Sequence, residues 1–123
     1  MRKKLHLMVV DDEPTIREVC VDILSSEGYS VATANNGREA VEMLTDRPAD
    51  LVLMDATMPG IDGIAACRLL KLDARTRHIP IVIMSAAGNT VTRLAAVQGM
   101  IVAFLPKPFD LDQLLATVKQ FAG

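Results

Sequence analysis

The sequence contains few aromatic residues, few cysteines and little net charge. None of its 123 residues is Trp, one is Tyr and three are Phe, and the formal net charge is −2. A nucleic-acid-binding surface is usually basic, so direct nucleic-acid binding is not expected. The two cysteines, Cys20 and Cys67, lie far apart in the chain, so they predict neither a disulfide framework nor a metal knuckle. We therefore expect a reducing compartment, the cytoplasm.

Long apolar segments are also missing. The longest stretch without a charged residue, 78–92, has 15 residues and is interrupted by Pro80, Gly88 and Asn89, whereas a membrane-spanning helix needs about 20 apolar residues. The apolar run near the N-terminus ends in three acidic residues, unlike a signal peptide. No membrane association is expected. With half of its residues hydrophobic, the chain is expected to form one domain over residues 1–123.

Short apolar runs alternate with amphipathic segments along the whole chain. The runs are Leu5–Val10, Tyr29–Ala34, Leu51–Met54, Ile79–Met84 and Ile101–Leu105. Four of them are almost continuously apolar, which is typical of strands buried on both faces of a parallel sheet. The second run, YSVATA, is the most polar and is expected at an edge of the sheet.

Helix signals lie between and after these runs. They are Pro14 with Gly28, Asn36 with Glu39, Asp62, an apolar pattern around Thr90–Gln98, and Asp110 with Gln113. Fivefold alternation of strand and helix predicts a parallel sheet with helices on both faces. We therefore predict a three-layer α/β/α fold with five helices and a five-stranded sheet. The pattern alone does not set the strand order: two orders are common in such folds, and we predict 2-1-3-4-5 as the better choice for five strands.

Charged and hydroxyl side chains follow four of the five runs. Asp11, Asp12 and Glu13 follow the first, Asp55 the third, Ser85 the fourth and Lys107 the fifth. The carboxyl ends of parallel strands share one edge of the sheet, so these side chains are expected to meet there. Clustered carboxylates must take up protons or hold a cation, and an all-oxygen site suits Mg²⁺. Together with Lys107, such a cation would attract a phosphoryl group, with Asp55 as the nucleophile.

Each of these residues also has a simpler interpretation. The acids at 11–13 can cap the following helix and interact with its dipole. Asp55 precedes a Met-Pro-Gly segment and can be a turn residue. Lys107, taken alone, can be a solvated surface lysine. Only the coincidence of four strand ends makes the metal and phosphoryl interpretation specific.

Four motifs contain the residues that follow the apolar runs. They are VVDDE at 9–13, LVLMDATMPGIDG at 51–63, IVIMSA at 81–86 and FLPKPF at 104–109. With these motifs at this spacing, the chain resembles a response-regulator receiver domain of two-component signalling, of the chemotaxis-regulator kind, over essentially its whole length. The resemblance implies a flavodoxin-like fold and a switch that is phosphorylated on an aspartate. It also implies a usually cis peptide between Lys107 and Pro108.

The resemblance assigns a role to each residue of the site. Asp55 is the expected phosphoacceptor. Asp12 and Asp55 are expected to bind Mg²⁺ directly and Asp11 mainly through water, and the Thr57 backbone carbonyl is expected to supply a further ligand. Ser85 and Lys107 are expected to contact the phosphoryl oxygens. Ser85 and Phe104 hold the positions of the switch residues. A permanently buried Phe104 is the alternative. Five positions separate Gly99 from Phe104, which suggests a loop one residue longer than usual in such domains.

Two further expectations concern lifetime and docking. Thr57 and Ala87 offer no carboxylate or amide to orient an attacking water, so a long-lived phosphoaspartate is expected. The segment from Ser85 to Leu105 carries one charge, on Arg93. The predicted face of helix four, strand five and helix five therefore suits a partner or a phosphorylation-dependent homodimer. Ordinary packing of small residues is the alternative.

The resemblance implies a signalling domain that assists only its own phosphorylation and dephosphorylation, not an enzyme acting on other substrates. The expected phosphodonor is a histidine kinase or a phosphotransfer protein in a phosphorelay. The expected recipient of the signal is a downstream protein or an output domain of the same protein. A phosphatase with an aspartyl nucleophile would typically need a second Asp at the position of Thr57. A flavodoxin-like cofactor module would need a Gly/Ser/Thr-rich loop where this chain has Asp-Asp-Glu-Pro.

Overall fold

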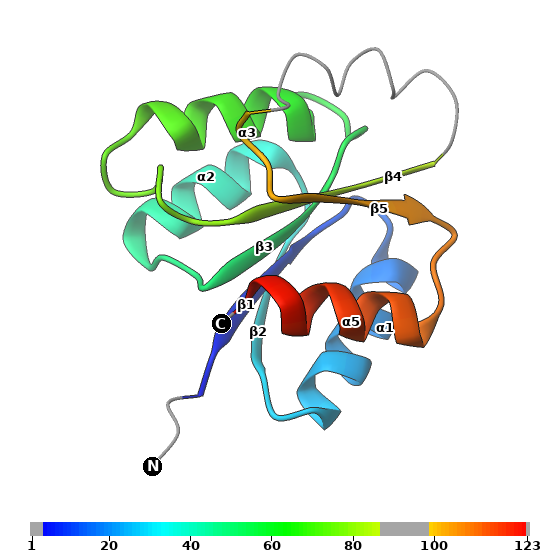
Figure 1. Ribbon diagram of the computed structural model, residues 1–123. Helices are drawn as coiled ribbons and strands as arrows, with labels where there is room; N and C mark the ends of the chain where they lie inside the picture. Colours follow the sequence, from blue (N-terminus) through cyan, green and yellow to red (C-terminus); the bar gives the residue numbers. More distant parts are fainter. Residues whose placement is uncertain (1–3, 87–98, 123) are drawn as a thin grey trace.

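The computed structural model describes residues 4–86 and 99–122. In chain order the elements are β1 (His6–Val10), α1 (Pro14–Ser26), β2 (Ser30–Ala34), α2 (Gly37–Asp46), β3 (Leu51–Asp55), α3 (Gly63–Leu72), β4 (Ile81–Ala86), β5 (Ala103–Lys107) and α5 (Leu111–Phe121). Figure 1 shows their arrangement. The helix predicted around Thr90–Gln98 lies outside the described residues.

The five strands form one parallel sheet in the order β2-β1-β3-β4-β5, as predicted. The polar strand β2 lies at one edge, and β5 lies at the other. In this order the carboxyl ends of β1 and β3 are neighbours, with Val10 paired to Met54. The residues that follow β1 therefore come close to the last residue of β3.

Helices cover both faces of the sheet, as the alternating pattern predicts (Figure 1). α1 and α5 pack on one face, and α2 and α3 pack on the other. Successive side chains of one strand enter opposite cores: Met8 and Val10 pack under α2 and α3, whereas Leu7 and Val9 pack under α1 and α5. This two-sided burial explains the almost continuous apolar runs.

Most helix ends form as the sequence predicts. Pro14 is the first residue of α1, the Asp62 carboxylate accepts the Ala65 N–H at 2.9 Å, and Asp110 and Gln113 form a complete capping box. The Asn36 side chain accepts the Glu39 N–H at 2.8 Å, as predicted. In a complete capping box the Glu39 carboxylate would accept the N–H of Asn36. Here it accepts the N–H of Asn35 instead, one residue earlier.

The predicted bounds of the last two strands are wrong by two residues. β4 begins at Ile81, because the Ile79 N–H is bound in the preceding turn and Pro80 has no N–H to donate. β5 begins at Ala103, since the apolar Ile101 packs on the core from a segment that is not a strand. As a result, Ser85 and Lys107 lie inside the ends of their strands. Within the described residues, no helix is both long and apolar enough to cross a membrane.

Candidate functional site

Three aspartates meet where β1 and β3 end. Asp11 and Asp12 follow β1 directly, and Asp55 is the last residue of β3. One carboxylate oxygen of each lies within 4.8 Å of the others. Asp11 and Asp55 are buried, whereas Asp12 is exposed. The convergence predicted from the strand order is therefore confirmed.

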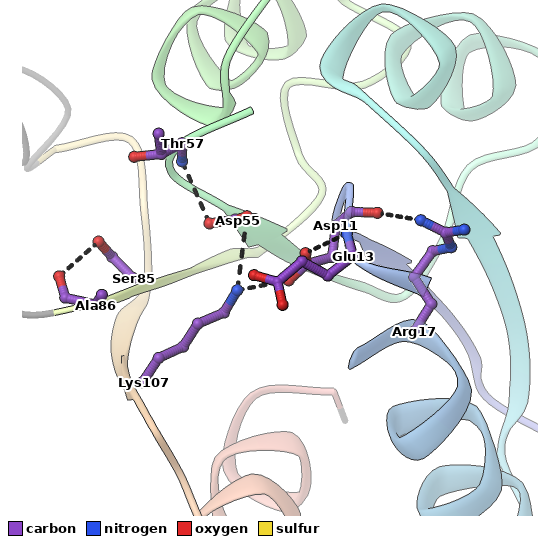
Figure 2. A network of polar contacts seen from close by, with 8 residues as sticks. All are labelled: Asp11, Glu13, Arg17, Asp55, Thr57, Ser85, Ala86 and Lys107. Carbon is purple, nitrogen blue, oxygen red and sulfur yellow. Dashed lines mark hydrogen bonds and ion pairs between the residues drawn. The ribbon is translucent and has the colours of Figure 1, made fainter. Parts of the chain in front are cut away.

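Asp11 is fixed by the groups around its carboxylate. Its Oδ2 lies 2.6 Å from the Nζ of Lys107, and its Oδ1 accepts the N–H of Glu13 at 3.0 Å (Figure 2). Asp11 has no exposed surface. A buried carboxylate requires a partner of this kind, because an unpaired charge is strongly unfavourable away from water.

Asp55 occupies a more open part of the same cluster. Its Oδ1 accepts the N–H of Thr57 at 3.2 Å, and its Oδ2 lies 3.6 Å from the Nζ of Lys107. Burial and the negative charge of Asp11 raise the pKa of Asp55 to about 6, although Lys107 and the Thr57 N–H act in the opposite direction. At pH 7 the carboxylate is therefore mostly ionised, as a nucleophile must be.

Lys107 bridges two of the three carboxylates. It reaches them from the end of β5, and only 15% of its side chain is exposed. Burial alone would lower the pKa of Lys107, but its hydrogen bond to Asp11 and the nearby carboxylate charges outweigh burial and raise that pKa. The ammonium is therefore charged at neutral pH. The interpretation of Lys107 as a solvated lysine is wrong.

Ser85 reaches the same edge of the sheet from β4. It is 3% exposed, and its hydroxyl donates to the carbonyl of Ala86 at 3.0 Å. In the register of β4 and β5, Ala86 pairs with Lys107, so Ser85 lies one position from that pairing. Phe104, at the second position of β5, is 40% exposed. It is therefore not a core residue in this state, while Ala87 lies outside the described residues.

The simpler interpretations of the acids do not account for all of their contacts. Glu13 is the N-cap of α1 but makes no side-chain capping bond. The Asp11 carboxylate pairs with Lys107 and also accepts the N–H of Glu13, the N-cap residue of α1. Asp55 accepts the N–H of Thr57, as a turn residue would, but it also ends a buried strand and faces a lysine. Turn formation alone does not explain its burial.

The donor set fits a small, hard divalent cation. The candidate ligands are carboxylate oxygens from Asp11, Asp12 and Asp55, and the exposed position of Asp12 leaves one side open to water. Mg²⁺ is usually held by one or two carboxylates and keeps several waters. The excess negative charge that raises the pKa of Asp55 would be offset by such a cation.

Two residues near the site were not predicted from the sequence. The Arg17 guanidinium donates to the main-chain carbonyl of Asp11 at 2.7 Å (Figure 2). Gly63 packs so closely on Asp55 that an added Cβ would collide with the Asp55 carbonyl oxygen. Nothing in the spacing of the charged residues pointed to Arg17. The signal for Gly63 was its place directly after the helix cap Asp62.

The acidic cluster, the lysine and the strand order agree with the family that the sequence resembles. A sequence profile described as the response regulator receiver domain matches residues 7–119. The chain belongs to this family. The peptide between Lys107 and Pro108 of this receiver domain is cis, as the resemblance implied.

Named relatives agree with this assignment. The receiver domain is 38% identical over 116 residues to the response regulator MprA of Mycolicibacterium vanbaalenii, which covers 94% of this chain and 49% of that protein. It is similar to the CheY-like receiver domain protein of Methanospirillum hungatei, at 29% identity, with a TM-score of 0.86 and coverage of 96% and 94% of the two chains. It is also similar to the signal receiver domain of a histidine kinase from Syntrophus aciditrophicus, at 31% identity, with a TM-score of 0.87 and coverage of 96% and 89%.

The chain spans about half the length of the curated relatives that it matches. Receiver domains act in two-component signalling, which makes this chain a signalling domain. The family is not an enzyme family as such.

Proposed function

We propose that this receiver domain is a phosphorylation-dependent switch that accepts a phosphoryl group on Asp55. The observation that carries the proposal is the position of Lys107, whose ammonium lies 2.6 Å from Asp11 and 3.6 Å from Asp55 within a cluster of three aspartates. The donor is a histidine kinase or a phosphotransfer protein. The recipient of the signal is a partner protein or an output domain of the same protein.

The chemistry follows from the groups around Asp55. A carboxylate oxygen of Asp55 forms a bond to phosphorus while the bond from phosphorus to the donor atom breaks, and the donor atom keeps the electron pair. Lys107 neutralises charge on the phosphoryl oxygens, and the Ser85 hydroxyl donates a hydrogen bond to them. Asp11, Asp12, Asp55 and the Thr57 carbonyl would hold Mg²⁺, which offsets the negative charges of the carboxylates and the phosphoryl group.

The response of the domain depends on Ser85 and Phe104. When Ser85 turns toward the phosphoryl group, Phe104 moves inward and changes the surface beside β5. Phe104 and Val102 are 40% and 43% exposed, so apolar surface is available there for a partner or a second copy of the chain. The protein acts in the cytoplasm, and the free thiols of Cys20 and Cys67 are compatible with a reducing compartment.

The proposal is tested by incubating the protein with a small acyl phosphate and Mg²⁺ and measuring the intact mass. Wild type gains one phosphoryl group, a chelator prevents the gain, and Asp55→Asn abolishes most of it. Asp62→Asn is the matched control, because Asn caps a helix about as well as Asp and Asp62 caps α3. Equal phosphorylation of wild type and Asp55→Asn would refute Asp55 as the acceptor.

A further inference from the structure

One hydrogen bond links α1 to the main chain of the aspartate cluster. Nη1 of Arg17 donates to the carbonyl oxygen of Asp11 at 2.7 Å (Figure 2). Arg17 lies in the first turns of α1 and is half-buried. The guanidinium therefore contacts the peptide group that joins Asp11 to Asp12, and among the described residues it pairs with no carboxylate.

Asp11 is held at every polar group that it possesses. Its N–H donates to the carbonyl of Ala34 at 3.2 Å, its Oδ1 accepts from the Glu13 N–H, and its Oδ2 pairs with Lys107. The remaining polar group, the main-chain carbonyl of Asp11, accepts the hydrogen bond from Arg17. The orientation of Asp11 is thus determined from β2, β5 and α1 together.

Asp12, unlike the buried Asp11, is exposed at the open side of the cluster. Its backbone nitrogen belongs to the same planar peptide as the Asp11 carbonyl. Fixing that carbonyl therefore fixes the start of the Asp12 backbone and the direction from which its side chain leaves. A guanidinium suits this role because it is always charged and its donors have a fixed geometry.

We infer that Arg17 is a positioning residue for the cation site: it holds the Asp11–Asp12 peptide so that the Asp12 carboxylate stays beside those of Asp11 and Asp55. This inference rests on the proposed function, since the cation is the Mg²⁺ of that proposal. Arg17 would act through the peptide that it binds, and not as a ligand of the cation or a contact of the phosphoryl group. A structural role in α1 alone would leave the cation affinity of the folded protein unchanged.

The test compares Mg²⁺ affinity by calorimetric titration in wild type, Arg17→Met and Arg17→Lys. Loss of a group that orients a metal ligand typically weakens metal binding 10–100-fold, so we expect a loss of about tenfold in Arg17→Met. Arg17→Lys restores a charged donor and is expected to recover part of the affinity. Arg38→Met is the matched control, because Arg38 is exposed on α2 and pairs with Glu42.

A second readout uses no metal. In metal-free protein, Arg17→Met shifts the amide NMR signals of Asp11 and Asp12, whereas Arg38→Met leaves them in place. If Arg17→Met does not fold, Arg17→Gln takes its place in both measurements. Folded Arg17 variants with wild-type Mg²⁺ affinity would overturn the inference while leaving the proposed function intact. A wild-type protein that neither binds Mg²⁺ nor becomes phosphorylated would instead refute the proposed function.

Discussion

Lys107 forms a 2.6 Å ion pair with Asp11, from which it is separated by 96 positions in the chain. The same ammonium lies 3.6 Å from Asp55. The pairing is possible because β5 and β1, although not adjacent in the sheet, both end at its carboxyl edge. One half-buried cation therefore acts on two carboxylates whose charges repel each other.

Removing this cation should change the titration of Asp55. In metal-free protein, Lys107→Met is expected to raise the pKa of Asp55 by roughly one pH unit or more, because a nearby cation favours the charged carboxylate. Carboxyl ¹³C NMR across a pH series measures this pKa. Lys119→Met is the control, since the 3.6 Å pair of Lys119 with Glu27 lies on the surface. An unchanged pKa of Asp55 in Lys107→Met would contradict the bridging role.

The raised pKa of Asp55 predicts a pH dependence of stability. The pKa is about 6 in the folded protein against an ordinary value of 3.8, so the folded state holds this proton more tightly. Protonation of Asp55 therefore stabilises the folded state in full below about pH 4, and this stabilisation is lost as the pH rises through about 6. In chelator, Asp55→Asn should avoid this loss and gain on the order of 3 kcal/mol over wild type at pH 7.

Urea unfolding of both proteins from pH 4 to 7 measures this difference. Asp22→Asn, at an exposed position on α1, is the control and should show a difference from wild type that stays constant with pH. A constant difference for Asp55→Asn as well would show that burial of Asp55 carries no such cost.

The close packing of Gly63 on Asp55 makes this position intolerant of a side chain. The added Cβ of Gly63→Ala would collide with the Asp55 carbonyl and meet the Met54 side chain at 3.0 Å. We expect Gly63→Ala to lower the free energy of unfolding by about 2 kcal/mol. Gly99→Ala is the control: an added Cβ there meets no heavy atom of the described residues within 4 Å, and a change within about 0.5 kcal/mol is expected. Equal melting temperatures of the two variants would contradict the argument.

Phosphorylation should reduce the exposure of Phe104, which is 40% in this structure. Binding of a phosphoryl mimic is expected to bury the ring. The relaxation of the ring protons in the presence of a soluble paramagnetic probe measures the change. Phe121, which packs on the core from α5, is an internal reference whose relaxation should not change. If Phe104 relaxes equally in both states, it is not part of the switch.

The phosphoaspartate should be long-lived. Thr57 is exposed beside Asp55 and carries no carboxylate or amide to orient an attacking water. Thr57→Asn introduces such a group and should shorten the half-life of the phosphorylated protein, whereas Thr45→Asn, on α2, should not. Loss of the phosphoryl group is followed by intact mass in Mg²⁺. A wild-type half-life of only a few seconds would reject the prediction.

The fold and the convergence of the site residues could be predicted because both follow from local patterns. Buried parallel strands require apolar runs, and their alternation with capped helices leaves few topologies, so Asp11, Asp55 and Lys107 were predicted at one edge of the sheet. The bounds of β5 were less predictable from the sequence. Ile101 is apolar because it packs on the core, although it lies before the first residue of the strand.

The sequence by itself thus determined the layers and the residues that follow each strand, since period and cap residues act over a few positions. The strand order was chosen between two common ones, and the structure decided it. Only the tertiary structure decided that Lys107 pairs most closely with Asp11, that Phe104 faces solvent, and that Arg17 binds a main-chain carbonyl. These relationships depend on the direction and reach of side chains from elements far apart in the chain. No local pattern encodes them, because they arise only once the sheet has brought those elements together.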